Sequence, residues 1–278
     1  MLIPRYWANK TGAATLPSGK SQPLMLWGWS QESLADAQAM VQRRWTELLA
    51  RLAGGEPPAR YAYGKLPLRE EILETLGEPG SSTEAVITRN LYGALVLNTA
   101  QVPFIDIDEP RLGCLAALKQ MFKRKPDVAP VLAAIREACQ RSGHRGFRIY
   151  RTCAGYRVLA TQLLLDPQAE NTQQLLDLFG ADPFFTKLCR LQSSFRARLT
   201  PKPWRCGHTR PPGRYPWDVP AVAQQFQTWL TRYEQASQKF ATCRYLETFG
   251  PEASSDAVRA IVRTHDRMCK VHEDLPLA

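Results

Sequence analysis

The sequence predicts an α+β fold whose core is an antiparallel sheet backed by helices. Apolar residues recur at helical spacing in some segments, and they form short continuous or alternating runs typical of strands in others. Gly, Asn and Pro stand between the short runs, as they do in hairpins. With 278 residues, of which 44% are hydrophobic, the chain can bury a sizeable core.

Residues 1–84 are expected to form an N-terminal αβ module. Short apolar runs, helical periodicity and glycine stops can each be recognised in this part of the chain. The expected elements, in chain order, are a strand at residues 23–29, a helix that Ser30 or less readily Ser33 caps and Gly54 ends, and a short helix at residues 68–76.

Residues 85–205 are expected to form the core domain. Its order of elements from residue 102 is β-α-β-β-α with a further strand near residue 190, which suits a ferredoxin-like or RNA-recognition-like sheet. Residues 184–198 fit a helix and a strand equally well. The other predicted elements are strands at 85–89, 94–98, 102–108, 147–152 and 156–161, and helices at 111–140 and from Asp166 or Asn171 to Phe179.

Residues 206–278 are expected to hold a proline-rich arm and a helical C-terminal region. Six prolines between residues 200 and 220 exclude the interior of a helix or strand there. Helical periodicity resumes over residues 222–240 and again over residues 256–272. His265 and His272 lie on the last of these helices and are expected at the surface.

The composition indicates the class of partner. The formal net charge of +10 favours polyanions such as nucleic acid, nucleotides or an anionic surface, with a solvated basic face as the alternative. No apolar stretch approaches the about 20 residues that span a bilayer, and the N-terminus lacks the pattern of a secretory signal. A cytoplasmic location with no membrane partner is therefore expected.

The cysteines do not indicate a disulfide framework. Seven cysteines are widely spaced and contain no CxxC pair, so reduced thiols are expected. Cys206 and His208 could form half of a zinc site with Cys189 or Cys243. That spacing matches no standard ligand pattern, and incidental thiols with a surface histidine are the favoured interpretation.

Asp106 and Asp108 are the sharpest chemical feature. Alternate residues of a strand face the same side, so the two carboxylates are expected side by side. Two such charges repel, and Mg²⁺ or Mn²⁺ would remove that cost while bridging to substrate phosphates. Glu109 could add a third oxygen. The alternative is a strand end whose acids meet water or arginines.

A predicted hairpin turn lies between Arg151 and Arg157. Gly155 at its tip allows backbone to approach a ligand closely, and Thr152 lies beside it. The two arginines could clamp phosphate oxygens, since the guanidinium fork matches their geometry. An ordinary hairpin with surface arginines is the alternative.

A basic run without acids extends from Lys187 to Trp217. Its composition of basic residues and interleaved aromatics is typical of a track for single-stranded nucleic acid, with a solvated basic face as the alternative. Its basic residues are Lys187, Arg190, Arg196, Arg198, Lys202, Arg205, Arg210 and Arg214, and its interleaved aromatics are Phe195, Trp204, Tyr215 and Trp217.

Taken in order, these segments resemble the catalytic core of the archaeo-eukaryotic primase (primase-polymerase) superfamily. Phe104–Asp108 is similar to its hDhD strand, and Thr152–Arg157 to its second, hairpin motif, although Arg157 stands where the family has a histidine. The resemblance implies metal ligands at Asp106 and Asp108. It further implies that Arg190, Ser194, Arg198 and Lys202 bind nucleotide.

The leading functional hypothesis is metal-dependent nucleotidyl transfer on nucleoside triphosphates and nucleic acid. Asp106 and Asp108 would hold Mg²⁺ or Mn²⁺, Arg151 and Arg157 would clamp phosphates, and the segment from Arg198 to Arg205 would hold the triphosphate or template. Two alternatives remain open. One is a non-catalytic protein that binds RNA or single-stranded DNA, and the other is a glycosyltransferase that uses the Asp-x-Asp pair.

Overall fold

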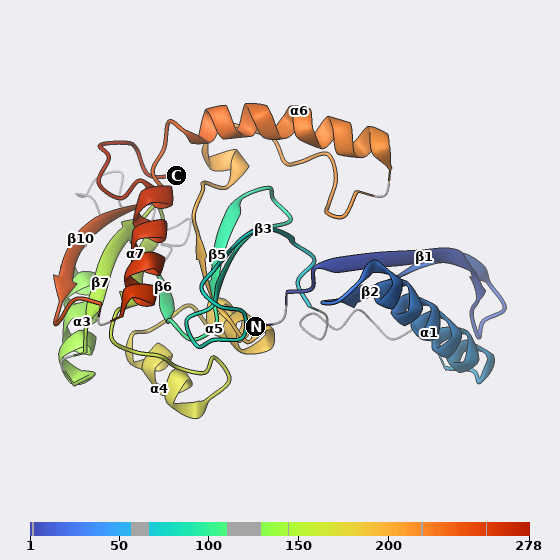
Figure 1. Cartoon of the computed structure of the whole chain (residues 1–278), viewed down its shortest axis with the longest axis horizontal. Coiled ribbons are helices and arrows are strands. Elements are labelled where there is room, and N and C mark those ends of the chain that lie inside the picture. The colour runs from blue at the N-terminus through green and yellow to red at the C-terminus, as the bar shows by residue number, and fades with distance from the viewer. Residues whose placement is uncertain (2, 57–66, 110–128, 144, 218, 254) are drawn as a thin grey trace, which may run out of the picture.

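The computed structural model describes all residues except 2, 57–66, 110–128, 144, 218 and 254. The described chain contains one two-stranded and two four-stranded antiparallel sheets together with helices, which confirms the predicted α+β class. Figure 1 shows the two larger sheets side by side, with a β-hairpin and a helix extending at one end of the molecule.

The N-terminal hairpin packs against one long helix. Strands β1 (Tyr6–Thr15) and β2 (Ser21–Ser30) pair along their full lengths, and α1 (Leu34–Ala53) lies against them. The cap of α1 is Ser33, whose side chain accepts a hydrogen bond from the Asp36 N–H, so the preference for Ser30 was wrong. The sequence predicted β2 but not β1.

The central sheet has the order β3-β4-β5-β9. The expected hairpin is present, and the expected helix at residues 68–76 is wrong because residues 71–76 form a strand paired with β4. A helix this short is only marginally stable by itself. A strand in its place pairs with the backbone N–H and C=O groups at the edge of β4. The strands are β3 (Glu71–Leu76), β4 (Ala85–Arg89), β5 (Leu95–Thr99) and β9 (Phe195–Arg198).

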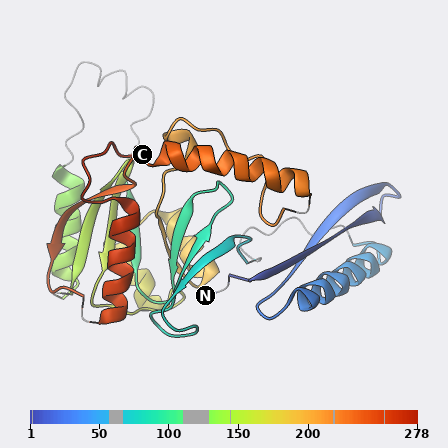
Figure 2. The ribbon, with the colours of Figure 1, turned by 45° about the horizontal axis from the view of Figure 1, so that its top comes forward.

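The second large sheet has the order β10-β7-β8-β6. Its outer strand β10 comes from the C-terminal region, where the sequence predicted only helices. In this sheet α3 (Ala129–Arg141) and α7 (Asp256–Cys269) cover opposite faces, as the two ribbon views show (Figure 2). The strands are β6 (Phe104–Asp108), β7 (Phe147–Thr152), β8 (Gly155–Ala160) and β10 (Cys243–Phe249).

The segment that fitted both a helix and a strand contains one of each. Helix α5 (Pro183–Gln192) ends at Ser193, which has a left-handed backbone with φ of 47°, and β9 begins directly afterwards. With α4 (Glu170–Leu178) before α5, the order of the described elements from β6 to β9 is β-α-β-β-α-α-β. Strand β9 hydrogen-bonds to β5 but lies beside β6, so it joins the two sheets.

The arm and the remaining helix form a second, smaller core. The arm contains the short helix η1 (Pro203–Arg205), and its residues Cys206 and Trp217 pack on α6 (Pro220–Ser237) around Phe226, Trp229 and Tyr233. The predicted helices at residues 222–240 and 256–272 are confirmed as α6 and α7. Within the described residues, none of the helices has the length and apolar character needed to span a membrane.

Candidate active site between β6 and β9

Asp106 and Arg157 form a two-bond ion pair across neighbouring strands. The register of β6 with β8 places them opposite each other, so their side chains share one face of the sheet. Arg157 Nε donates to Asp106 Oδ1 at 2.8 Å, and a second guanidinium nitrogen donates to Oδ2 at 3.2 Å. The arginine side chain is 2% exposed and the aspartate side chain 31% exposed, so the pair opens to solvent on its aspartate side.

The remaining contacts of Arg157 hold it inside the protein. Its third nitrogen donates to the carbonyl oxygen of Arg198 at 2.9 Å and lies 3.4 Å from Nε2 of His265. Burial alone would lower the pKa of Arg157, but the charge and hydrogen bonds of Asp106 outweigh it and raise that pKa. Arg157 is therefore a fixed positive charge that contacts the backbone of β9.

A polar network continues from Arg157 into the sheet. His265 is fully buried and its Nδ1 lies 3.0 Å from Asp266, whose carboxylate also accepts from Tyr150 at 2.7 Å and Arg148 at 2.7 Å. The expectation of a surface position for His265 was wrong. The signal was available, because His265 lies on the same helical face as the buried residues Val258, Ile261 and Cys269.

Cys243, His265 and Cys269 form a buried group with metal-ligand chemistry. Their ligand atoms all lie within 4.8 Å of one another. Burial would raise the pKa of Cys243, but Cys269 and the positive charge of His265 lower it well below its usual value. Thiolate and imidazole suit zinc rather than Mg²⁺. The Nε2 atom of His265, which would bind such a metal, lies 3.4 Å from a guanidinium nitrogen of Arg157 and 3.8 Å from the sulfur of Cys243.

Asp108 is exposed at the end of β6, two residues beyond Asp106 and on the same face. Glu109, the expected third oxygen donor, accepts two hydrogen bonds from Arg151 at 2.8 and 2.9 Å. Asp106 is engaged by Arg157 in the same way, so a cation at this strand end would share the Asp106 carboxylate with Arg157 and also bind Asp108, which makes two carboxylates. That number suits Mg²⁺, which commonly uses one or two carboxylates together with waters and substrate phosphates.

The turn after β7 does not supply the expected arginine clamp. Arg151 pairs in register with Tyr156, whereas Arg157 pairs with Tyr150, so the two arginines lie on opposite faces of the sheet. Gly155 has a packing role, because a Cβ there would lie 2.0 Å from the carbonyl oxygen of Ile107. Thr152 lies opposite Cys243 at the end of β7.

Strand β9, which lies beside β6, carries two arginines. Arg196 and Arg198 alternate with buried Ala197 and therefore share a face. Burial and the charge of Arg157 lower the pKa of Arg198, while the charge of Asp106 opposes that effect. The carbonyl oxygen of Arg198 accepts from Arg157 at 2.9 Å, which brings the backbone of β9 against the pair of Asp106 and Arg157. We call the place where Asp106, Arg157 and Arg198 meet, between β6 and β9, the seam.

Several buried polar atoms along β9 have no hydrogen-bond partner among the described residues. They are Oγ of Ser194, one terminal nitrogen of Arg196 and Nε of Arg198. Arg196 also donates to Glu70 at 2.8 and 3.0 Å through its other terminal nitrogen. Buried donors without partners are costly, so these groups are suited to a ligand that accepts hydrogen bonds.

The other predicted ligand residues divide between the seam and other surfaces. Arg205, in η1, is close enough for its charge to lower the pKa of Arg198. Lys202 places its ammonium 5.6 Å from the ring centre of Trp204. Arg190 is exposed on α5 and lines a separate pocket with Lys187 and Thr186. The structure thus brings Arg198 near Asp106 and Arg205 near Arg198, but leaves Arg190 elsewhere.

Comparison with known proteins adds no family assignment, because no protein-family model, curated protein or solved structure matches the chain.

Proposed function

We propose that the protein is a metal-dependent nucleotidyltransferase of primase-polymerase type, acting on a nucleoside triphosphate and nucleic acid at the seam. The observation that carries the proposal is the meeting of Asp106 and Asp108 on one strand face with Arg157 and Arg198 from two other strands. Carboxylates and arginines in one place suit a cation together with a polyphosphate.

Each residue has a distinct task in this proposal. Asp106 and Asp108 would hold Mg²⁺ or Mn²⁺, which when bound neutralises phosphate charge and lowers the pKa of a coordinated hydroxyl. Arg157 holds the Asp106 carboxylate in a fixed orientation through two hydrogen bonds. Arg198 and Arg205 would place positive charge against the triphosphate, and the unpaired Nε of Arg198 would gain a phosphate oxygen.

The proposed reaction is a phosphoryl displacement. A 3′-hydroxyl attacks the α-phosphorus, a new phosphorus–oxygen bond forms, and the bond to the β-phosphate breaks. Pyrophosphate leaves and the hydroxyl proton passes to solvent. Positioning and electrostatic stabilisation carry most of the catalysis in reactions of this kind.

The decisive experiment uses Asp108 rather than Asp106. Asp108 is exposed, so Asp108→Asn removes a carboxylate without uncovering a buried charge. Incorporation of labelled nucleotide on a primed template with Mn²⁺ is expected to fall by at least about 100-fold. Glu74→Gln, an exposed acid on β3, is the matched control and should retain full activity. Equal incorporation by Asp108→Asn and wild type would rule out the proposal.

A specific observation also favours a second function, binding of RNA or single-stranded DNA without catalysis. Both oxygens of Asp106 already accept hydrogen bonds from Arg157, and both oxygens of Glu109 accept from Arg151. This alternative predicts affinity that falls steeply with salt and is indifferent to EDTA. The glycosyltransferase hypothesis lacks comparable support, because the sheets of the described residues are antiparallel.

A further inference from the structure

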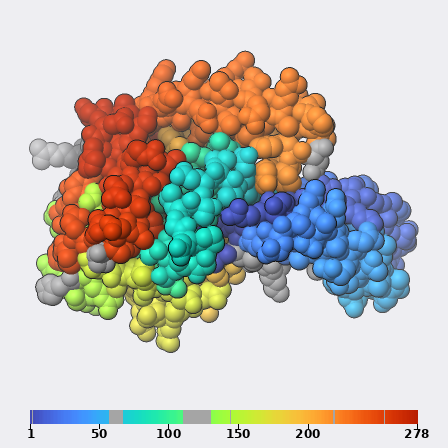
Figure 3. All heavy atoms as spheres, in the orientation of Figure 1, coloured from blue at the N-terminus to red at the C-terminus, as the bar shows by residue number. Residues whose placement is uncertain are grey.

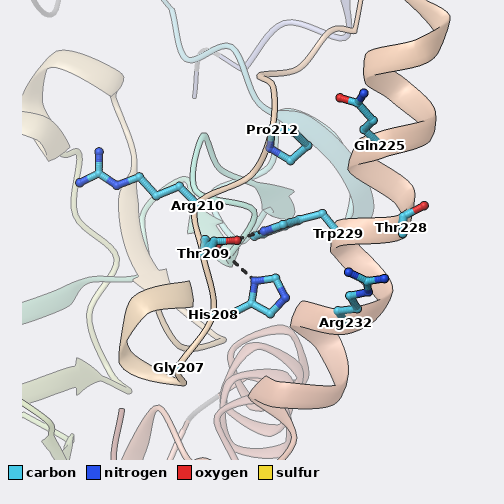
Figure 4. Close-up of a pocket in the computed structure, with 9 residues that line it drawn as sticks. All are labelled: Gly207, His208, Thr209, Arg210, Pro212, Gln225, Thr228, Trp229 and Arg232. Atoms are coloured by element: carbon cyan, nitrogen blue, oxygen red, sulfur yellow. Dashed lines mark hydrogen bonds between the residues drawn. The ribbon is translucent and has the colours of Figure 1, made fainter.

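The proline-rich arm and α6 enclose a pocket that lies apart from the aspartates. Its volume is about 610 Å³, and none of the described residues that line it is acidic. Figure 4 shows the arm running alongside α6, with His208 and the ring of Trp229 between them and Arg210 extending away from the helix. In the space-filling view the orange arm and α6 lie above the cyan central sheet (Figure 3).

A hydrogen bond and an aromatic contact hold the two walls of the pocket together. Trp229 is 7% exposed, and its indole nitrogen donates to the carbonyl oxygen of Thr209 at 3.0 Å. The ring of His208 lies edge-on to Trp229, with 5.3 Å between ring centres. The arm is thereby fixed to α6. The exposed cationic side chains Arg210 and Arg232 come from the arm and the helix, respectively.

An exposed tryptophan stands beside this pocket. Trp204 is 44% exposed, although large aromatic side chains are usually more buried. Lys202 and Arg210 approach its ring at 5.6 and 5.4 Å from the centre, and Tyr92 supports it edge-on at 5.1 Å. The ring is held in place by its neighbours while a large part of its surface remains open to solvent.

This surface follows the seam along the chain, because η1 is the next element after β9. Trp204 and Arg205 are adjacent in η1, and the charge of Arg205 acts on Arg198 at the seam. A polyanion that contacts the arm could therefore continue to the β9 arginines. The charge of the arm excludes a basic partner, and the open aromatic ring distinguishes the surface from one that merely attracts phosphate.

We infer that the arm and α6 form a binding site for single-stranded nucleic acid. One base stacks on Trp204, and adjacent phosphates contact Lys202, Arg210 and Arg232. The inference rests on the proposed function, because it supplies the nucleic acid on which the seam would act. We call this surface the Trp204 platform, comprising Lys202, Trp204, Arg210, Trp229 and Arg232.

The test measures binding of fluorescein-labelled oligothymidylate by anisotropy in EDTA, where no metal chemistry takes place. Trp204→Ala is expected to weaken binding by about 5- to 150-fold, the range for loss of one base–aromatic stack. Trp204→Phe should recover most of the affinity. Tyr6→Ala, which removes another exposed aromatic, is the matched control and should bind like wild type.

The charge contribution is tested separately through salt. Arg210→Gln should reduce the slope of log affinity against log salt by about 0.7, as expected for one phosphate contact on a single strand. Arg43→Gln, an exposed arginine on α1, should leave the slope unchanged. A Trp204→Ala affinity within twofold of wild type would overturn the inference. A loss of affinity in Arg210→Gln without a loss in Trp204→Ala would also overturn the inference, because that result indicates a general polyanion surface.

Failure of the inference and failure of the proposed function give different results. If wild type incorporates nucleotides but Trp204→Ala binds oligothymidylate normally, the platform is wrong and the proposed function stands. If Trp204→Ala loses binding while wild type incorporates no nucleotide, the platform stands and catalysis at the seam is wrong.

Discussion

Arg157 lies directly opposite Asp106 in the ladder between β6 and β8, and its guanidinium makes bonds of 2.8 and 3.2 Å to the two carboxylate oxygens. The arginine is enclosed, whereas the aspartate keeps a path to solvent. Because Arg157 is buried and Asp106 is partly exposed, the loss of the Asp106 charge and the loss of the Arg157 charge should affect stability differently. The pair therefore links the stability of the second large sheet to the chemistry proposed at the seam.

Asp106→Asn is expected to lower the free energy of unfolding by about 3–5 kcal/mol, because it leaves the buried charge of Arg157 uncompensated. Asp108→Asn should change it by less than about 0.5 kcal/mol, since Asp108 is exposed. Urea titrations of both variants measure the difference. Equal stability of the two variants would show that Arg157 gains nothing from Asp106.

Gly155→Ala is expected to destabilise the protein by more than about 2 kcal/mol. The added Cβ would meet the Ile107 carbonyl oxygen at 2.0 Å and the backbone of Asp108 and Glu109 at 3.0 Å, which forces β6 and β8 apart. Gly54→Ala is the control, because Gly54 has a negative φ and its nearest contact would be 3.4 Å. Thermal unfolding of both variants tests the prediction, and similar midpoints would contradict it.

Asp266→Asn should remove part of the acid sensitivity of the protein. Burial would raise the pKa of Asp266, but hydrogen bonds from His265 and Tyr150 lower it below the ordinary 3.8. Its contribution to stability is therefore present above about pH 3.8 and is lost as the pH falls through the lower folded pKa. The stability gap between wild type and Asp266→Asn should narrow below that pH.

The control for this titration is Asp274→Asn, because Asp274 is fully exposed. Urea unfolding between pH 6 and pH 3 should show little difference between this control and wild type at any pH. A gap for Asp266→Asn that stays constant over the same range would contradict the assignment.

The thiols should react with iodoacetamide in a defined order at pH 8. Cys153 is exposed at the turn after β7 and should react first among the cysteines that the structure describes. Burial raises the pKa of Cys139 and of Cys189 to about 12, which lowers the thiolate fraction by roughly a thousandfold relative to an ordinary thiol. Peptide mapping by mass spectrometry follows each site. Rapid native labelling of Cys189 would show that α5 does not protect it.

Local pattern was sufficient for much of the fold. The apolar runs around residues 85–108 predicted β4, β5 and β6, and helical spacing predicted α1, α6 and α7. These segments have periods that their own side chains impose, so their structure depends little on distant partners. Residues 71–76 and β10 were missed because each is stabilised by pairing with a strand that is distant along the chain or separated by a turn.

For the candidate site, the sequence by itself determined that Asp106 and Asp108 share a strand face, because side chains alternate along any strand. Only the tertiary structure decided their neighbours. It placed Arg157 against Asp106, turned Arg151 to the opposite face, brought Arg198 from β9 and buried His265 behind the pair. The physical reason is that strand register and charge neutralisation in a core depend on residues far apart in the chain, and no local period encodes them.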